Sequence, residues 1–233
     1  MKQEAFIEGT RCNCKFRPLL DEKGLHLVSG CGKDGYRNQL HDSLAYCLKD
    51  FYNYAGIMAR REEPHCFKHV DVNNNMRPDI SLFNIPTYTN KLIIDVSVTS
   101  PIPPNNQLAT MSKAQALIPF RQAIYSFKNK MKKYENIAKD NNLSFMPCIF
   151  ESTGKIHPES FKLLTLGFKQ MSSKDTVKFS SIKFFWMAKI SCTFQKCVAN
   201  SILSHSALIN GSYVNENNFQ YNVNYIEDFA NSY

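Results

Sequence analysis

The 233-residue chain has no apolar run that approaches the ~18–20 residues of a membrane-spanning helix. Behind the N-terminal stretch 1–5 there is no apolar core of the kind that a secretory signal peptide carries. The sequence also contains no internal repeat and no low-complexity tract. These absences argue against a membrane protein, a secreted protein and a repeat architecture. We expect an intracellular chain with no membrane partner.

Acidic residues are scarce relative to basic ones. The chain has 20 Asp and Glu against 28 Lys and Arg, which gives a formal net charge of +8. This excess favours a polyanionic partner such as nucleic acid, although many basic proteins bind none. Hydrophobic residues make up 43% of the chain, including 17 Phe and 11 Tyr, so a sizeable core is expected rather than global disorder. The length suits one large domain, or one domain with a small appendage.

Eight cysteines in an intracellular chain are better explained as buried thiols or metal ligands than as a disulfide framework. Near the N-terminus, Cys12 and Cys14 are followed by His26 and Cys31. Three thiols and one imidazole make a sufficient tetrahedral zinc set, and nearby glycines would let a short loop fold around the ion. We therefore expect structural zinc here, with His41 as the reserve ligand if Cys14 does not reach. The alternative is a glycine-rich loop with free thiols.

Apolar periodicity predicts helices and strands along the rest of the chain. The expected elements, in order, are a helix over 36–61, strands over 80–83 and 92–98, a helix over 111–140, a strand over 143–150, and helices near 158–171 and 180–205. This order predicts an α/β fold with a small mixed sheet flanked by helices. The chain divides into a zinc-knuckle-like segment over 1–35, a main domain with C-terminal helices over 36–208, and a flexible tail over 209–233.

Two aspartates stand in otherwise apolar surroundings, Asp79 just before the strand over 80–83 and Asp95 within the strand over 92–98. An isolated carboxylate in an apolar strand costs free energy unless a metal ion or hydrogen-bond partners compensate it. Strand alternation places Asp95 on the same face as Ser97. Two such carboxylates about one hairpin apart favour a divalent-metal site, with Mg²⁺ or Mn²⁺ as the ion.

The helix expected over 111–140 carries an apolar stripe at alternating intervals of three and four residues, which is a packing pattern. Its flank has more Lys and Arg than Asp and Glu. At ~100° per residue, Lys130 lies roughly 90° from the centre of the stripe and Lys133 about 150° away. Lys130 can therefore reach a site at the edge of the sheet, whereas Lys133 meets solvent or phosphate. The alternative is that these charges are only the solvated face of the helix.

Two carboxylates on neighbouring strands with a lysine nearby are the parts of a metal-dependent phosphodiesterase. The carboxylates would hold one or two Mg²⁺ ions, which activate water and neutralise charge on the scissile phosphate. The lysine would orient the attacking water or stabilise the transition state. Exposed basic residues of the same helix would contact phosphates without regard to sequence: Lys128, Lys132 and Lys133.

These residues resemble a known family. The stretches Arg77-Pro78-Asp79, Asp95-Val96-Ser97 and Lys130-Met131-Lys132-Lys133-Tyr134 are similar to the restriction-like endonuclease domain of site-specific non-LTR retrotransposons, a branch of the PD-(D/E)XK nucleases. Those elements carry a Cys-Cys-His-Cys zinc knuckle just before the nuclease, in the order found here at positions 12, 14, 26 and 31. Glu63-Pro64 also recurs in related transposon-derived sequences. The resemblance spans roughly residues 11–205.

The resemblance implies a restriction-endonuclease-like fold, a nuclear location, and DNA as the partner, with RNA of the parent element as the alternative. No organic cofactor is implied. Asp79 and Asp95 would bind Mg²⁺. The implied catalytic lysines are Lys130 and Lys133, and the implied nucleic-acid-binding residues are Arg77, Lys128, Lys132, Lys133 and Tyr134. The chain departs from the family at Ser97, where the strand normally carries lysine, so Lys130 would take that role from the helix.

Three functions remain open. The first is a metal-dependent endonuclease that nicks target DNA. The second is a catalytically silent module that keeps the zinc loop and the basic helix for binding nucleic acid. The third is a packed remnant without function. Because 233 residues leave no room for a reverse-transcriptase segment, we expect a remnant, a truncated gene model or a co-opted copy of such an element. The presence of all three catalytic positions, Asp79, Asp95 and Lys130, favours the nuclease.

Overall fold

The structure is a computed structural model, and it describes residues 9–12, 14–15, 19–20, 26, 31, 36–64, 66–67, 77–85, 87–101, 118–172 and 179–209. Within these residues the chain forms four α-helices and four β-strands. In sequence order they are α2 (Tyr36–Tyr54), β1 (Met58–Arg61), β2 (Ile80–Phe83), β3 (Leu92–Thr99), α5 (Arg121–Asp140), β4 (Ser144–Glu151), α6 (Pro158–Ser172) and α7 (Phe179–Ile209). The predicted mixed α/β class is confirmed.

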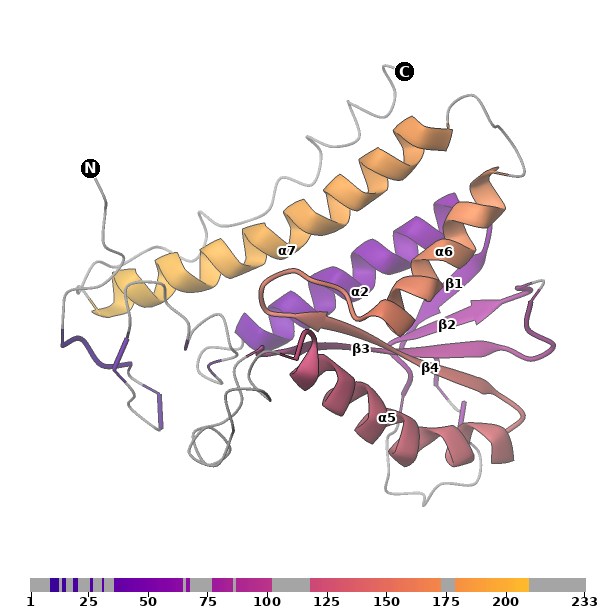
Figure 1. Cartoon of the computed structure of the whole chain (residues 1–233), viewed down its shortest axis with the longest axis horizontal. Coiled ribbons are helices and arrows are strands. Elements are labelled where there is room, and N and C mark those ends of the chain that lie inside the picture. The colour runs from indigo at the N-terminus through magenta and orange to yellow at the C-terminus, as the bar shows by residue number, and fades with distance from the viewer. Residues whose placement is uncertain are drawn as a thin grey trace.

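The strands form one mixed sheet in the order β1-β2-β3-β4. β1 pairs antiparallel with β2, and β2 with β3, whereas β3 and β4 run parallel. Parallel neighbours need a crossover connection, and helix α5 provides it. α5 packs against one face of the sheet, α2 and α6 cover the other face, and α7 packs along α2 (Figure 1). Both faces of the central strand β3 are therefore covered, as its apolar sequence requires.

The main hydrophobic core lies between the sheet and the helices α2, α6 and α7. Leu44 and Phe51 bring the apolar stripe of α2 into this core, and Trp186 of α7 packs edge-on against the Phe51 ring. Gly167 of α6 lies so close to Phe51 that an added Cβ would come within 2.5 Å of the ring. A side chain at this position would therefore force the buried Phe51 ring or the α6 backbone to move.

Strand β3 presents different residues to its two faces. Ile94 and Val96 are buried in the main core, whereas Ile93 belongs to a smaller cluster with Ala138 of α5. Asp95 follows the same alternation as Ile93 and points toward α5. The facing predicted from strand alternation is confirmed, and it brings the carboxylate of β3 to the helix that carries the basic flank.

The helix predicted over 36–61 is too long. α2 ends at Tyr54, and Gly56 then takes a left-handed φ of 80°, which a side chain disfavours. The turn is closed by the N–H of Ile57, which donates to the carbonyl of Tyr52 at 2.9 Å. The chain then continues as strand β1. Periodicity missed this strand because the apolar spacing of α2 runs on into it, and strand β1 is only four residues long.

The helix predicted over 111–140 begins later within the described residues. α5 starts at Arg121, and Phe120 before it adopts a left-handed φ of 56°. This conformation is incompatible with a continuing right-handed helix. Phe120 therefore lies outside the helix, and the apolar stripe of α5 starts at Ile124. Residues 102–117 lie outside the described residues.

The remaining predicted elements are confirmed with small shifts at their ends. The strands predicted over 80–83, 92–98 and 143–150 correspond to β2, β3 and β4, and the two C-terminal helices correspond to α6 and α7. Most of the segment 1–35 and the predicted tail from 210 onward lie outside the described residues. No helix in the described part of the chain is long and apolar enough to cross a membrane.

Candidate functional site

Four potential metal ligands meet in the N-terminal part of the chain. The ligand atoms of Cys12, Cys14, His26 and Cys31 all lie within 4.8 Å of one another. The Sγ atoms of Cys12 and Cys31 are 3.6 Å apart, and Cys14 Sγ lies 3.5 Å from His26 Nε2. Tetrahedral zinc, with bonds of ~2.3 Å to sulfur and ~2.0 Å to nitrogen, requires ligand separations of about 3.5–3.8 Å. The predicted quartet could therefore hold a metal such as zinc.

This Cys/His cluster is sheltered and anchored to the rest of the fold. Cys12, Cys14 and Cys31 are buried, and they pack with Leu20 and with Ile202 of α7. The backbone N–H of Cys14 donates to Cys12 Sγ at 3.4 Å, and such contacts orient metal-binding thiolates. None of the eight cysteines forms a disulfide, so the thiols of the cluster are not committed to one. A metal bound here would tie the N-terminal segment to α7.

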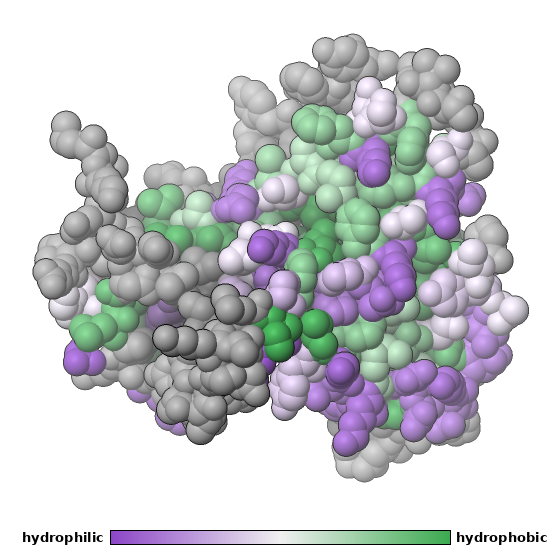
Figure 2. All heavy atoms as spheres, in the orientation of Figure 1, coloured by the Kyte–Doolittle hydropathy of each residue, from purple (hydrophilic) through white to green (hydrophobic). Residues whose placement is uncertain are grey.

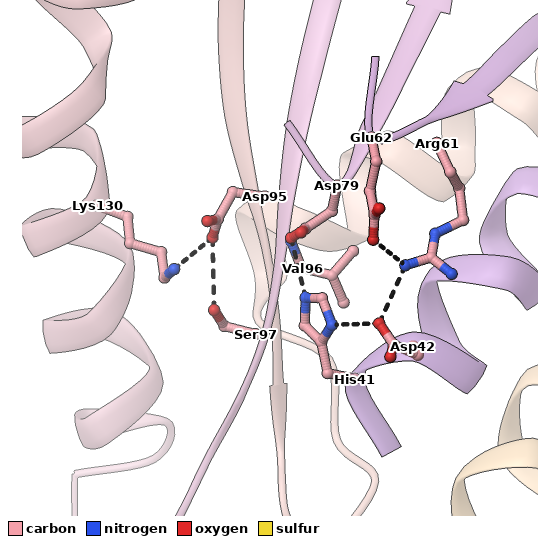
Figure 3. A network of polar contacts seen from close by, with 9 residues as sticks. All are labelled: His41, Asp42, Arg61, Glu62, Asp79, Asp95, Val96, Ser97 and Lys130. Atoms are coloured by element: carbon pink, nitrogen blue, oxygen red, sulfur yellow. Dashed lines mark hydrogen bonds and ion pairs between the residues drawn. The ribbon is translucent and has the colours of Figure 1, made fainter. Parts of the chain in front are cut away.

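Asp79 lies directly before β2 and is held through one carboxylate oxygen. Its Oδ2 accepts a hydrogen bond of 2.6 Å from the N–H of Val96 and lies 3.1 Å from His41 Nε2 (Figure 3). Val96 is two residues beyond Ile94, the last β3 residue that pairs with β2. The Asp79 carboxylate therefore accepts a backbone hydrogen bond of β3 just beyond the end of the β2–β3 pairing. The reserve role that the sequence suggests for His41 is not needed, because Cys14 reaches the cluster, and His41 faces Asp79 instead.

Asp95 points the other way, toward α5. Its Oδ2 forms an ion pair with Lys130 Nζ and accepts a hydrogen bond of 3.4 Å from Ser97 Oγ (Figure 3). Burial raises the pKa of Asp95 above its usual value, and the charge and hydrogen bond of Lys130 offset this only in part. The negative charge of Asp79 also raises the pKa of Asp95. The two carboxylates therefore influence each other, although each has its own basic neighbour.

Helix α5 presents Lys130 at the edge of its buried face. Ala123 and Ala138 are the buried positions of the helix, and the Lys130 side chain keeps 25% of its surface exposed. The contact that helical geometry predicts from Lys130, rather than from Lys133, is present. Lys133 is exposed, and its Nζ lies 4.7 Å from the ring centre of Tyr134. A hydrogen bond to Tyr134 raises the pKa of Lys133.

The other predicted nucleic-acid-binding residues differ in their surroundings. Arg77, Lys128 and Lys132 are exposed. Figure 2 shows hydrophilic residues gathered over α5, on the side that faces away from the sheet. Tyr134 is half-buried, and its ring centre lies 5.5 Å from that of Phe145 on β4. Lys128 and Lys132 thus belong to a basic outer face of α5, while Tyr134 helps α5 to pack on the sheet.

Asp42 and Arg61 extend the polar contacts of Asp79, and the sequence did not reveal them. His41 Nδ1 lies 3.1 Å from Asp42 Oδ1, and Arg61 Nη2 donates to the same oxygen at 3.0 Å. Arg61 Nη2 also donates to Glu62 at 3.2 Å. The hydrogen bond to Asp79 raises the pKa of His41, against the opposing effect of burial. The only sequence signal was an adjacent His and Asp at the start of a helix, which is not specific.

A separate carboxylate, Glu63, forms a different kind of contact. Its Oε2 accepts hydrogen bonds from Lys91 Nζ at 2.9 Å and from Cys66 Sγ at 3.4 Å. Burial alone would raise the pKa of Glu63, but hydrogen bonds from Lys91, Ser81 and Cys66 outweigh it and lower the pKa below its usual value. Glu63 follows β1 and Lys91 precedes β3, so this pair ties the two strands together.

No protein-family model matches the chain, and no curated protein matches it significantly. Function therefore has to be argued from the sites themselves. Across the described residues, the Cys/His cluster is the one place where three or more His, Cys, Asp or Glu ligand atoms converge. The pair of Asp79 and Asp95 does not form such a group. It is a polar site with two carboxylates, each contacted by a basic side chain.

Proposed function

We propose that the chain is a metal-dependent endonuclease of retrotransposon origin that nicks DNA in the nucleus, with Asp79, Asp95 and Lys130 as its catalytic set. The observation that carries the proposal is the ion pair between Lys130 and Asp95. In nucleases of this type the lysine stands on the strand two residues after the acid, where this chain has Ser97. Helix α5 supplies an ammonium group to the same carboxylate, so the missing strand lysine has a replacement.

The fold supports the same proposal at a coarser level. A mixed four-stranded sheet is covered by helices on both faces, and the carboxylates come from the residue just before β2 and from the middle of β3. We infer a restriction-endonuclease-like arrangement from this order, with the Cys/His cluster as the zinc-binding segment that precedes it. The basic outer face of α5 lies on the helix that also carries Lys130.

The donor set suits a hard divalent cation such as Mg²⁺ or Mn²⁺. Carboxylate oxygens are the ligands that these ions prefer, and the side chains of Asp79 and Asp95 are only 19% and 25% exposed. The raised pKa of Asp95 follows mainly from burial, and shows that Lys130 does not fully compensate its charge. Asp79 and Asp95 would hold the cation, which when bound supplies Lewis acidity toward the scissile phosphate.

The side chains of the protein would bind and orient the DNA. In hydrolysis, water forms a bond to phosphorus while the bond from phosphorus to the leaving oxygen breaks, and a proton of the water passes to the leaving oxygen. Negative charge grows on the phosphate oxygens in the transition state. Lys130 would donate hydrogen bonds to one of these oxygens and stabilise that charge. Arg77, two residues before Asp79, and the exposed Lys128 and Lys132 would hold flanking phosphates, and Lys133 would add positive charge beside them.

The test is nicking of supercoiled plasmid by the full chain with Mg²⁺ or Mn²⁺. The wild-type protein should convert the plasmid to open circles, and Asp79→Ala should abolish the conversion. Asp50→Ala removes an exposed carboxylate from α2 and should leave nicking unchanged. Equal nicking by the wild type and by Asp79→Ala would contradict the proposal, because the activity would then come from elsewhere.

A catalytically silent nucleic-acid-binding module is the second candidate. The observation that favours it is that His41 and Lys130 already contact the two aspartates, so the site is satisfied without an added cation. Such a module would bind DNA or RNA through the basic outer face of α5. Its affinity would fall with salt at a logarithmic slope of about −0.9 for each phosphate contact, and Asp79→Ala would leave binding unchanged. Salt-dependent binding without nicking in any metal would favour this candidate.

A further inference from the structure

A continuous chain of polar contacts joins helix α2 and strand β1 to Asp79. Arg61 Nη2 lies 3.0 Å from Asp42 Oδ1, and the same oxygen lies 3.1 Å from His41 Nδ1. On the other side of the imidazole ring, His41 Nε2 lies 3.1 Å from Asp79 Oδ2. Figure 3 shows His41 between the two carboxylates, with Arg61 behind Asp42. Each nitrogen of the ring therefore faces a carboxylate oxygen.

This geometry fixes the chemical role of His41. An ionised carboxylate accepts hydrogen bonds but donates none, so a ring nitrogen that bonds to it must carry a hydrogen. Because both nitrogens of His41 face carboxylates, the ring satisfies both contacts only as a double donor. His41 therefore bridges Asp42 and Asp79 through its two ring nitrogens. A neutral ring would leave one of the two contacts without a hydrogen.

Packing holds Arg61, the last residue in this series of contacts. The Arg61 side chain is only 9% exposed, and the centre of its guanidinium group lies 3.9 Å from the ring centre of Tyr46 on α2. Its Nε is buried without a hydrogen-bond partner. A buried donor left unsatisfied costs free energy. The stacking on Tyr46 and the hydrogen bonds of Nη2 to Asp42 and Glu62 therefore hold the guanidinium in place despite this cost.

We propose that His41 is a positioning residue for Asp79, with Asp42 and Arg61 as its support. Asp79 precedes β2 and is not itself part of the strand, so its side chain depends on tertiary contacts for a fixed direction. The contact from His41 reaches the same Oδ2 that accepts the hydrogen bond from Val96 N–H. His41 therefore holds the carboxylate against β3. The catalytic consequence rests on the proposed nuclease function, whereas the effect on Asp79 does not.

The first measurement uses the backbone amide of Val96 as a reporter in the full chain. Its hydrogen bond of 2.6 Å to Asp79 Oδ2 should give a downfield proton resonance and slow hydrogen exchange. Asp79→Ala defines the full loss of this signal. His41→Ala should move the Val96 resonance and its exchange rate most of the way toward that limit, and Asp42→Ala should cause a smaller shift in the same direction.

Two variants separate positioning from general damage to α2. The side-chain amide of His41→Gln can still donate to Asp79, so this variant should restore most of the Val96 signal. Asp50→Ala, which removes another carboxylate from the same helix, should leave it unchanged. A wild-type Val96 signal in His41→Ala would overturn the proposal. Equal loss in His41→Gln and His41→Ala would also overturn it. If His41→Ala does not fold, the Gln and Asp42 variants still decide the question.

The second measurement is the nicking rate of the same variants at saturating DNA. His41→Ala should lower the turnover rate about 10- to 100-fold, as the loss of an orienting partner behind a metal ligand does, and His41→Gln should recover most of it. A wild-type turnover rate in His41→Ala would contradict a catalytic role for the positioning. If the wild type does not nick DNA while Val96 responds to His41→Ala, the positioning role stands and the proposed nuclease function fails.

Discussion

The Cys/His cluster and the carboxylate site satisfy their polar groups in different ways. In the cluster, three thiols and an imidazole converge within 4.8 Å of one another, and two of the pairs lie at 3.5 and 3.6 Å, close to the separations of a tetrahedral zinc site. In the carboxylate site, Asp79 has the imidazole of His41 and Asp95 has the ammonium group of Lys130. The cluster could therefore hold a metal such as zinc, because its ligand atoms face one another. In the carboxylate site, each aspartate instead already has a basic neighbour of its own.

The largest expected effect is on the cluster. Removing zinc with a strong chelator, or replacing Cys31 with Ser, should unfold the N-terminal segment, because structural zinc contributes about 10 kcal/mol or more to small metal-binding folds. Metal analysis of the purified protein should find one zinc per chain, and Cys31→Ser should lose it. Cys192→Ser changes an exposed cysteine on α7 and should keep the zinc. Equal zinc content in Cys31→Ser and Cys192→Ser would contradict zinc binding by the Cys/His cluster.

A smaller effect is expected at the two aspartates, whose replacement by Asn should change the free energy of unfolding in different ways. Asp79→Asn should lower the free energy of unfolding at neutral pH by about 1.5 kcal/mol, since hydrogen bonds to charged groups contribute about 1.5–3 kcal/mol. Asp95 differs because its folded pKa is raised, so its ionised form costs stability at neutral pH, and this cost disappears as the pH falls through the folded pKa. Asp95→Asn should therefore leave the stability unchanged or raise it. Thermal unfolding at neutral pH measures both variants.

A larger loss of unfolding free energy in Asp95→Asn than in Asp79→Asn would contradict this prediction. The ionised carboxylate that stabilises the protein would then be Asp95 and not Asp79. A repeat of the measurement at acidic pH provides the internal control. There the Asp95 carboxyl is protonated in the folded wild type, and the difference between the wild type and Asp95→Asn should shrink.

The smallest effect concerns Glu63, whose pKa is lowered rather than raised. Because the folded pKa lies below the usual value, the ion pair with Lys91 stabilises the protein above the usual pKa, and this stability is lost as the pH falls through the folded pKa. Glu63→Gln should cost about 1 kcal/mol at neutral pH and less in acid. Glu159→Gln breaks an exposed pair with Lys162 on α6 and should cost about half as much or less. Equal losses would mean that burial of Glu63 does not matter.

Much of this arrangement could be predicted, for identifiable physical reasons. The four residues of the Cys/His cluster lie close together in the sequence, and their chemical type predicts a metal site. Helical geometry fixes the direction of a side chain relative to a packing stripe, so Lys130 could be selected over Lys133. Strand alternation likewise fixed the face of Asp95. Each of these inferences depends on one local element with a known period.

The remainder depends on contacts between elements that are distant in sequence. His41 reaches Asp79 because α2 packs on the sheet, and Arg61 reaches Asp42 because β1 folds back beside α2. Apolar spacing instead predicts a helix over the residues of β1. The left-handed conformations of Gly56 and Phe120 set the boundaries of α2 and α5. Tertiary packing decides such conformations, and apolar spacing alone does not reveal them.

The central claim is that Lys130 and the two aspartates form a catalytic set, and a matched pair of lysines on α5 tests it most directly. Lys130 pairs with Asp95, whereas Lys139 forms a surface pair with Glu135 on its own helix. In the plasmid-nicking assay with Mn²⁺, Lys130→Ala should lower the rate about 100-fold or more, as the loss of a transition-state donor does, while Lys139→Ala should retain the wild-type rate. Wild-type nicking by Lys130→Ala, or equal losses in the two variants, would contradict the claim.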